Sequence, residues 1–94
     1  MKVTINGKRY NTSKCEVLCE IEHRDYEGNL SGTTRLIRAS NGQLLEWCES
    51  NGRDLNIRDY VCAWRKSERT IDEFTMTDEQ EARCAKLGLI AVID

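Results

Sequence analysis

The sequence predicts an α+β fold: a small antiparallel sheet of about five to six strands built from hairpins, with one short C-terminal helix packed on one face. Two Asn-Gly pairs lie between strand-like runs, and both residues tolerate the positive φ angles of a tight turn. One stretch between them alternates apolar and polar residues, as a half-buried strand does. A helix-capping signature follows near the C-terminal end. A length of 94 residues predicts a single domain.

The fold is organised around a central hairpin, in which residues 34–39 and 43–48 flank Ser40-Asn41-Gly42. A two-residue Asn-Gly loop would leave apolar side chains on both faces of this ribbon. A longer loop with a bulge at the glycine would instead gather three side chains on one face, namely Ile37, Leu45 and Trp47. Shifting the register by one residue flips every side chain, so both alternatives stay open here.

The preceding segment contributes an opening hairpin of residues 2–5 and 8–10, followed by a turn or single helical turn at residues 11–13. Residues 15–22 then alternate, with glutamates on one side and only Leu18 breaking the pattern. This predicts a strand with one buried side, formed by Cys15, Val17, Cys19 and Ile21. A long polar loop is expected over residues 23–32.

The second half is expected to contain further short elements and the helix. Thr77 and Gln80 form the capping signature, and Gly88 is the expected stop. The other elements, in order, are a loop at 49–54, a strand at 55–65 (with a helix at 56–64 as the alternative), a polar turn at 65–69, a strand at 70–74, and a last strand at 89–93. An apolar second face of the sheet could be covered by the helix or by a second copy of the protein, as a homodimer.

Charge is distributed unevenly, although the net charge is only −2. Four basic residues and no acid occur in residues 1–14, whereas residues 15–34 carry five acids against one arginine. The chain as a whole lacks the concentrated basic surface of a strong nucleic-acid binder. No apolar segment approaches the roughly 20 residues that span a bilayer, and no secretory signal opens the chain. We therefore expect a cytoplasmic protein that does not bind membranes.

Chemistry-bearing residues do not form a convincing catalytic or metal pattern. Five cysteines in a cytoplasmic chain are expected to be reduced thiols. Cys15, Cys19 and His23 have a regular spacing, but a structural zinc site would need a fourth ligand from elsewhere. The single histidine lies in a polar stretch, and the glycines are isolated. We expect no enzyme activity, no metal and no cofactor.

Two surfaces could bind a partner. The first is an acidic row with its following loop, which could dock on a basic partner or could simply be a solvated edge: Glu16, Glu20, Glu22, Asp25, Tyr26 and Glu27. The alternative is a sheet surface that stacks single-stranded bases through Arg35, Arg38 and Trp64. Because the chain has only six aromatic residues, we favour a core position for them, with the arginines at the rims.

The order of these signals resembles a group of small proteins of phages and other bacterial mobile elements. Residues 5–12, Ile-Asn-Gly-Lys-Arg-Tyr-Asn-Thr, are similar to their opening GKRYDT, with Asn11 in place of the usual Asp. Residues 34–38 with Gly42 resemble their hairpin, and residues 74–82 resemble their helix entry without its proline. Some phage proteins of this kind are anti-CRISPR inhibitors. The resemblance implies a non-enzymatic inhibitor of a host defence nuclease, such as a Cas effector, in the bacterial cytoplasm.

Overall fold

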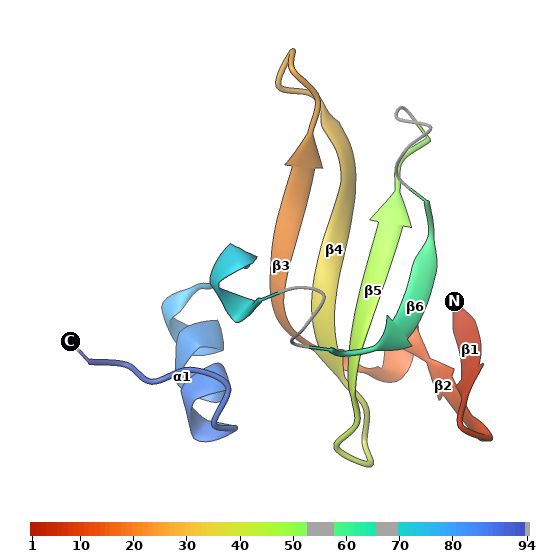
Figure 1. The fold of residues 1–94 in the computed structure, drawn as a ribbon, viewed down its shortest axis with the longest axis vertical. Coiled ribbons are helices and arrows are strands. Elements are labelled where there is room, and N and C mark those ends of the chain that lie inside the picture. The colour runs from red at the N-terminus through yellow and green to blue at the C-terminus, as the bar shows by residue number, and fades with distance from the viewer. Residues whose placement is uncertain (53–57, 66–69, 94) are drawn as a thin grey trace.

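The structure, a computed structural model, describes residues 1–52, 58–65 and 70–93 and has an α+β fold with two antiparallel sheets (Figure 1). The small sheet pairs β1 (Lys2–Ile5) with β2 (Lys8–Asn11). The larger sheet contains, in spatial order, β3 (Glu16–Arg24), β4 (Leu30–Arg38), β5 (Leu44–Ser50) and β6 (Tyr60–Ala63). The helices are η1 (Thr12–Lys14) and η2 (Ile71–Glu73), both 3-10, and α1 (Asp78–Lys86). The predicted fold class is confirmed, with the correction that the strands divide between two sheets.

Both faces of the four-stranded sheet are covered by elements of the chain itself. In Figure 1, α1 lies on one side of the sheet and the β1–β2 hairpin on the other. The helix-side core is formed by Leu18, Cys19, Leu36, Phe74 and Cys84. The hairpin-side core is formed by Tyr10, Ile37, Ala39 and Leu45. Adjacent residues of a strand point to opposite faces, so β4 supplies a fully buried residue to each core.

The central turn has the longer of the two predicted loops. Arg38 pairs with Leu44, and the Ala39 N–H donates to the Gln43 carbonyl (2.9 Å). Gly42 adopts a φ of 88°, a conformation that side-chain-bearing residues rarely adopt, and this closes a three-residue loop. The resulting register gathers three side chains on the hairpin-side face, as the bulge alternative predicts: Ile37, Leu45 and Trp47.

A bulge in β3 overturns the predicted side assignment of that strand. Val17 pairs with Ile37 and Cys19 with Leu36, so Leu18 is an extra residue that is fully buried in the helix-side core. Residues before the bulge therefore change face relative to residues after it. The four residues predicted to share one buried side are therefore divided between the two faces. Cys15 and Val17 pack in the hairpin-side core, whereas Cys19 and Ile21 pack in the helix-side core.

Several expected boundaries also differ. The loop expected over residues 23–32 is only residues 25–29, because β3 and β4 extend into it. The strand expected at 70–74 is instead the 3-10 helix η2, and its N-cap residue Thr70 donates its backbone N–H to the Glu73 carboxylate (2.9 Å). Of the strand expected at 55–65, only β6 is observed as a strand. Residues 53–57, within the expected loop and strand, and residues 66–69, within the expected polar turn, lie outside the described residues.

The C-terminal helix begins and ends as predicted, but the strand expected after it is absent. Thr77 Oγ1 accepts from the Gln80 N–H (3.2 Å), and the Gln80 side chain accepts from the Thr77 N–H (3.0 Å). After Gly88, at a φ of 76°, the Leu89 N–H bonds to the Cys84 carbonyl (2.9 Å). This turn directs residues 89–90 onto the helix-side core instead of toward a sheet edge, so residues 89–93 form no strand. No helix in the described ranges is long and apolar enough to cross a membrane.

Candidate functional site

The tip of the β3–β4 hairpin is a compact loop, residues 25–29, that projects beyond both covering layers (Figure 1). The Asp25 carboxylate accepts from the backbone N–H groups of Glu27 and Asn29, each at 2.9 Å. The Asp25 N–H also donates to the Asn29 carbonyl (2.9 Å), and the Gly28 N–H donates to the Asp25 carbonyl (3.0 Å). These bonds hold the loop in one shape while Tyr26 is 97% exposed.

The predicted acidic row is divided by the β3 bulge. Glu16 lies on the helix side, with its carboxylate 3.6 Å from the Arg83 guanidinium. Glu20 and Glu22 follow the bulge, and they pair with Arg35 and Thr33 on the neighbouring strand β4. Of the six residues predicted to bind a partner, Asp25 organises the loop, and Glu16 lies on the other face of the sheet from Glu20 and Glu22. The other four belong to the projecting hairpin and are called the hairpin surface below: Glu20, Glu22, Tyr26 and Glu27.

Ion pairs within the chain partly neutralise this surface. The Glu20 carboxylate lies 3.5 Å from Arg35 Nε, and the Glu22 carboxylate lies 2.5 Å from Arg24 Nη2. In the Glu22–Arg24 pair both side chains are exposed. An exposed pair of this kind contributes little to stability, so it can exchange for a pair with a partner at low cost. The Arg24 guanidinium also donates to the Gly28 carbonyl (3.0 Å), which links the strand to the loop.

A hollow of about 360 Å³ lies beside the acidic pair, at the outer edge of β3. Its walls are Glu20 and Glu22 on the strand, and Thr75, Met76, Thr77 and Gln80 at the start of α1. The Thr75 N–H donates to the Glu20 carbonyl (3.0 Å) and forms a single bridge there. Within the described ranges, β3 has no other strand partner on this edge. The hollow therefore combines two carboxylates with backbone groups that a partner could pair with.

The residues of the alternative base-stacking surface do not come together. Trp64 packs edge-on against Phe74 in the helix-side core, with ring centroids 5.6 Å apart. Arg35 lies on the opposite face, with its guanidinium carbon 4.6 Å from the centre of the Trp47 ring. Arg38 is at the far end of β4, beside the central turn. The Arg35–Trp47 stack is not among the contacts expected from the sequence. It follows from the three-residue turn, because that register places the two residues opposite each other.

The three regularly spaced residues Cys15, Cys19 and His23 occupy three different environments. Cys15 packs in the hairpin-side core, whereas Cys19 is fully buried in the helix-side core. His23 Nε2 lies 2.6 Å from Thr34 Oγ1. Burial raises the pKa of Cys19 to about 12, with a smaller contribution from the neighbouring Cys84 thiol. Among the described residues, no three side chains of metal-binding type lie close enough to hold an ion.

Comparison of this chain with protein-family models, with curated proteins and with solved structures finds no match. The geometry of the hairpin surface therefore carries the functional inference. That surface places an exposed aromatic residue, carboxylates and an open strand edge at one end of the molecule.

Proposed function

We propose that this chain is a non-enzymatic binding protein that docks its hairpin surface on a basic partner, a host defence nuclease in the bacterial cytoplasm, and inhibits it by occlusion. The single observation that carries the proposal is Tyr26, almost fully exposed at the tip of a loop fixed by its own hydrogen bonds. The resemblance to small phage proteins makes CRISPR–Cas effectors the first partners to test.

A fixed, exposed tyrosine suits a binding anchor. Tyrosine buries a large area on binding, adds a hydroxyl for hydrogen bonding, and is enriched among residues that dominate binding energy. Because the Asp25 carboxylate already orders the loop, the chain loses little conformational freedom when Tyr26 enters a partner's pocket. This preorganisation is a reason to assign recognition to the tip.

The charge around Tyr26 favours a basic partner. From Glu20 to Gly28 the hairpin carries four acids and one arginine, a sum of −3 with neutral histidine. Nucleases that hold a guide or target strand do so in positively charged channels. An acidic hairpin would be attracted to such a channel over a Debye length of about 8 Å at physiological salt, and would compete there with the nucleic-acid backbone.

The partner class is tested by adding the purified chain to purified Cas effector–guide complexes and measuring cleavage of target DNA. The proposal expects cleavage to fall as the chain approaches one equivalent per effector, and the chain to co-elute with the inhibited complex. If no effector type binds the chain and cleavage is unchanged throughout, the assignment to this partner class is wrong.

The surface is tested separately with Tyr26→Ala. We expect this variant to bind the inhibited effector complex at least about 30-fold more weakly, since an anchor of this kind contributes about 2 kcal/mol or more. Its unfolding free energy should change by less than about 0.5 kcal/mol, because the side chain is exposed. Glu27→Lys should weaken binding most at low salt, whereas Asp72→Lys, the same charge change at an exposed position in η2, should not. Undiminished binding by Tyr26→Ala would remove the tip from the interface.

A further inference from the structure

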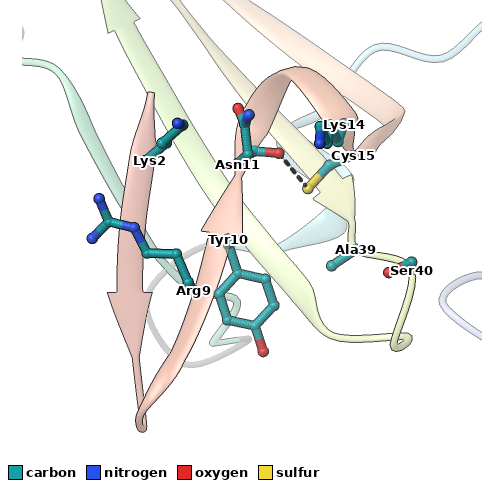
Figure 2. A pocket seen from close by; sticks show the side chains of 8 residues that line it. All are labelled: Lys2, Arg9, Tyr10, Asn11, Lys14, Cys15, Ala39 and Ser40. Atoms are coloured by element: carbon teal, nitrogen blue, oxygen red, sulfur yellow. Dashed lines mark hydrogen bonds between the residues drawn. The ribbon is translucent and has the colours of Figure 1, made fainter.

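A groove of about 400 Å³ lies between the β1–β2 hairpin and the central β4–β5 turn (Figure 2). Figure 2 shows Tyr10 with Lys2 and Arg9 on the hairpin side, Lys14 and Cys15 on the segment after β2, and Ala39 and Ser40 on the turn. Asn41 Nδ2 donates to Tyr10 Oη (3.1 Å), which ties the turn to the hairpin. Segments about 30 residues apart in sequence thus build one concave surface.

The polar groups that line this groove are mainly hydrogen-bond donors. Lys2, Arg9 and Lys14 are the cationic residues of the lining, and no carboxylate lines the groove within the described part of the chain. Asn11 Oδ1 already accepts from the backbone N–H and the hydroxyl of Ser13 (3.2 and 2.8 Å). The amide NH₂ of Asn11 is therefore the part of that side chain that remains to donate.

These cations differ from most arginines on the four-stranded sheet and α1. Arg24, Arg35 and Arg83 each lie within 4.0 Å of a carboxylate. Within the described ranges, no carboxylate lies within that distance of the three groove cations, and Arg9 donates to the Thr4 hydroxyl instead (3.0 Å). The 14 N-terminal residues contain no acid at all. The groove is thus a local concentration of positive charge in a chain whose net charge is −2.

We propose that this groove binds a phosphorylated small molecule of nucleotide size that carries two or more phosphate groups. Lysine and arginine groups with amide and hydroxyl donors are the side chains that bind phosphate oxygens, and guanidinium can contact two oxygens at once. Three cations match the charge of a diphosphate. The volume lies within the range of about 300–1,000 Å³ that is typical of small-molecule sites. The hairpin surface is not part of this site, so the proposal is independent of the proposed function.

The test is isothermal titration of the full chain with ADP and with inorganic pyrophosphate at low salt. Adenosine and sulfate serve as ligand controls. The groove variants are Lys2→Met, Arg9→Gln and Lys14→Met, all at exposed positions where substitution should leave the fold intact. Lys8→Met is the matched control, because it removes one positive charge from the same hairpin but from outside the groove lining.

We expect ADP and pyrophosphate to bind, adenosine not to bind, and each groove variant to weaken ADP binding about tenfold, the loss of one charge-assisted contact. Lys8→Met should weaken it less than about twofold, and Tyr26→Ala should leave it unchanged. The proposal is overturned by any of four results: no binding at millimolar ADP; equal binding of sulfate, which would indicate an adventitious ion only; equal losses for Lys8→Met and the groove variants; or tighter binding of a short oligothymidylate than of ADP, which would assign the groove to nucleic-acid phosphates.

Discussion

At the scale of single residues, the thiol of Cys19 has the most altered chemistry in the described part of the chain. It is fully buried between β3 and α1, next to the Cys84 thiol. Burial raises the Cys19 pKa to about 12 from an ordinary value of 9.0, and burial also raises the Cys84 pKa. Both thiols therefore remain protonated in the folded chain at physiological pH. Since the thiolate is the nucleophile, neither residue is suited to covalent catalysis while the fold is intact.

This burial predicts a specific loss of stability at alkaline pH. Below about pH 9 the Cys19 thiol is protonated in both the folded and unfolded chain, so it has no effect on pH dependence. Between about pH 9 and 12 the unfolded chain releases this proton and the folded chain keeps it, so the free energy of unfolding falls as pH rises, by at most about 1.4 kcal/mol per pH unit. Urea unfolding from pH 8 to 11, under reducing conditions, measures this slope.

Cys19→Ala should flatten the alkaline slope, whereas Cys62→Ala, a change at a partly exposed cysteine in β6, should retain it. The alanine variant will have a lower stability at pH 8 because it leaves a small cavity, so the comparison is between slopes and not between absolute values. Identical slopes for Cys19→Ala and the unmodified chain would show that the thiol titrates alike in both states.

At the scale of elements, α1 depends on its cap more than a long helix would. It has only nine residues, and Cys84 is its one fully buried side chain among those described. Such a short helix is marginal alone, so capping bonds contribute a large share of its stability. The reciprocal Thr77–Gln80 bonds satisfy two backbone N–H groups that would otherwise be unpaired at its start.

We therefore expect Thr77→Ala to lower the free energy of unfolding by about 1 kcal/mol. Thr77→Ser should retain most of this stabilisation, because serine keeps the accepting hydroxyl. Thr75→Ala, two residues earlier, changes an exposed side chain whose backbone forms the bridge to Glu20, and should cost less than about 0.5 kcal/mol. Chemical denaturation of the three variants measures these losses in unfolding free energy and checks their order. Equal costs for Thr75→Ala and Thr77→Ala would contradict it.

The elements that the sequence predicts correctly have local causes. Both hairpin turns and the helix cap depend on residues within four positions of each other, and all three are observed. The bulge at Leu18 has a non-local cause: an extra residue in β3 is tolerated because its side chain fills the core beneath α1, more than 60 residues later in the chain. The same distinction applies to the candidate site. Tyr26 at a loop tip is predictable, whereas the division of the acidic row requires the bulge.

Other differences also reflect tertiary packing. Residues 89–93 are apolar and suit a strand by composition, yet the turn at Gly88 places Leu89 and Ile90 against the helix-side core and leaves Ile93 84% exposed. The groove between the β1–β2 hairpin and the central turn could not be predicted either, because Lys14 and Ser40 line one surface only when the opening hairpin covers the sheet. Charge counting identified its basic residues but not the concave surface they line.

At the scale of the whole molecule, one sheet joins two small cores. Leu36 and Ile37, adjacent in β4 and both fully buried, belong to the helix-side and hairpin-side cores respectively. The same alternation holds for Leu44 and Leu45 in β5. Neither covering layer has an independent core, so loss of either exposes a face of the shared strands. A single cooperative unit is the expected consequence.

The two tryptophans allow this expectation to be tested, since Trp47 packs in the hairpin-side core and Trp64 in the helix-side core. Neither indole N–H has a hydrogen-bond partner among the described residues, so a change to phenylalanine leaves no described acceptor unpaired and should cost about 1.5 kcal/mol or less. In Trp47→Phe the remaining tryptophan, Trp64, reports by its fluorescence on the helix side alone. In Trp64→Phe the remaining Trp47 reports on the hairpin side alone. In each variant, the fluorescence and far-ultraviolet circular dichroism curves in guanidinium should coincide. If fluorescence in Trp64→Phe changed at a lower denaturant concentration than circular dichroism, the N-terminal hairpin would detach before the sheet unfolds, and the groove would open with it.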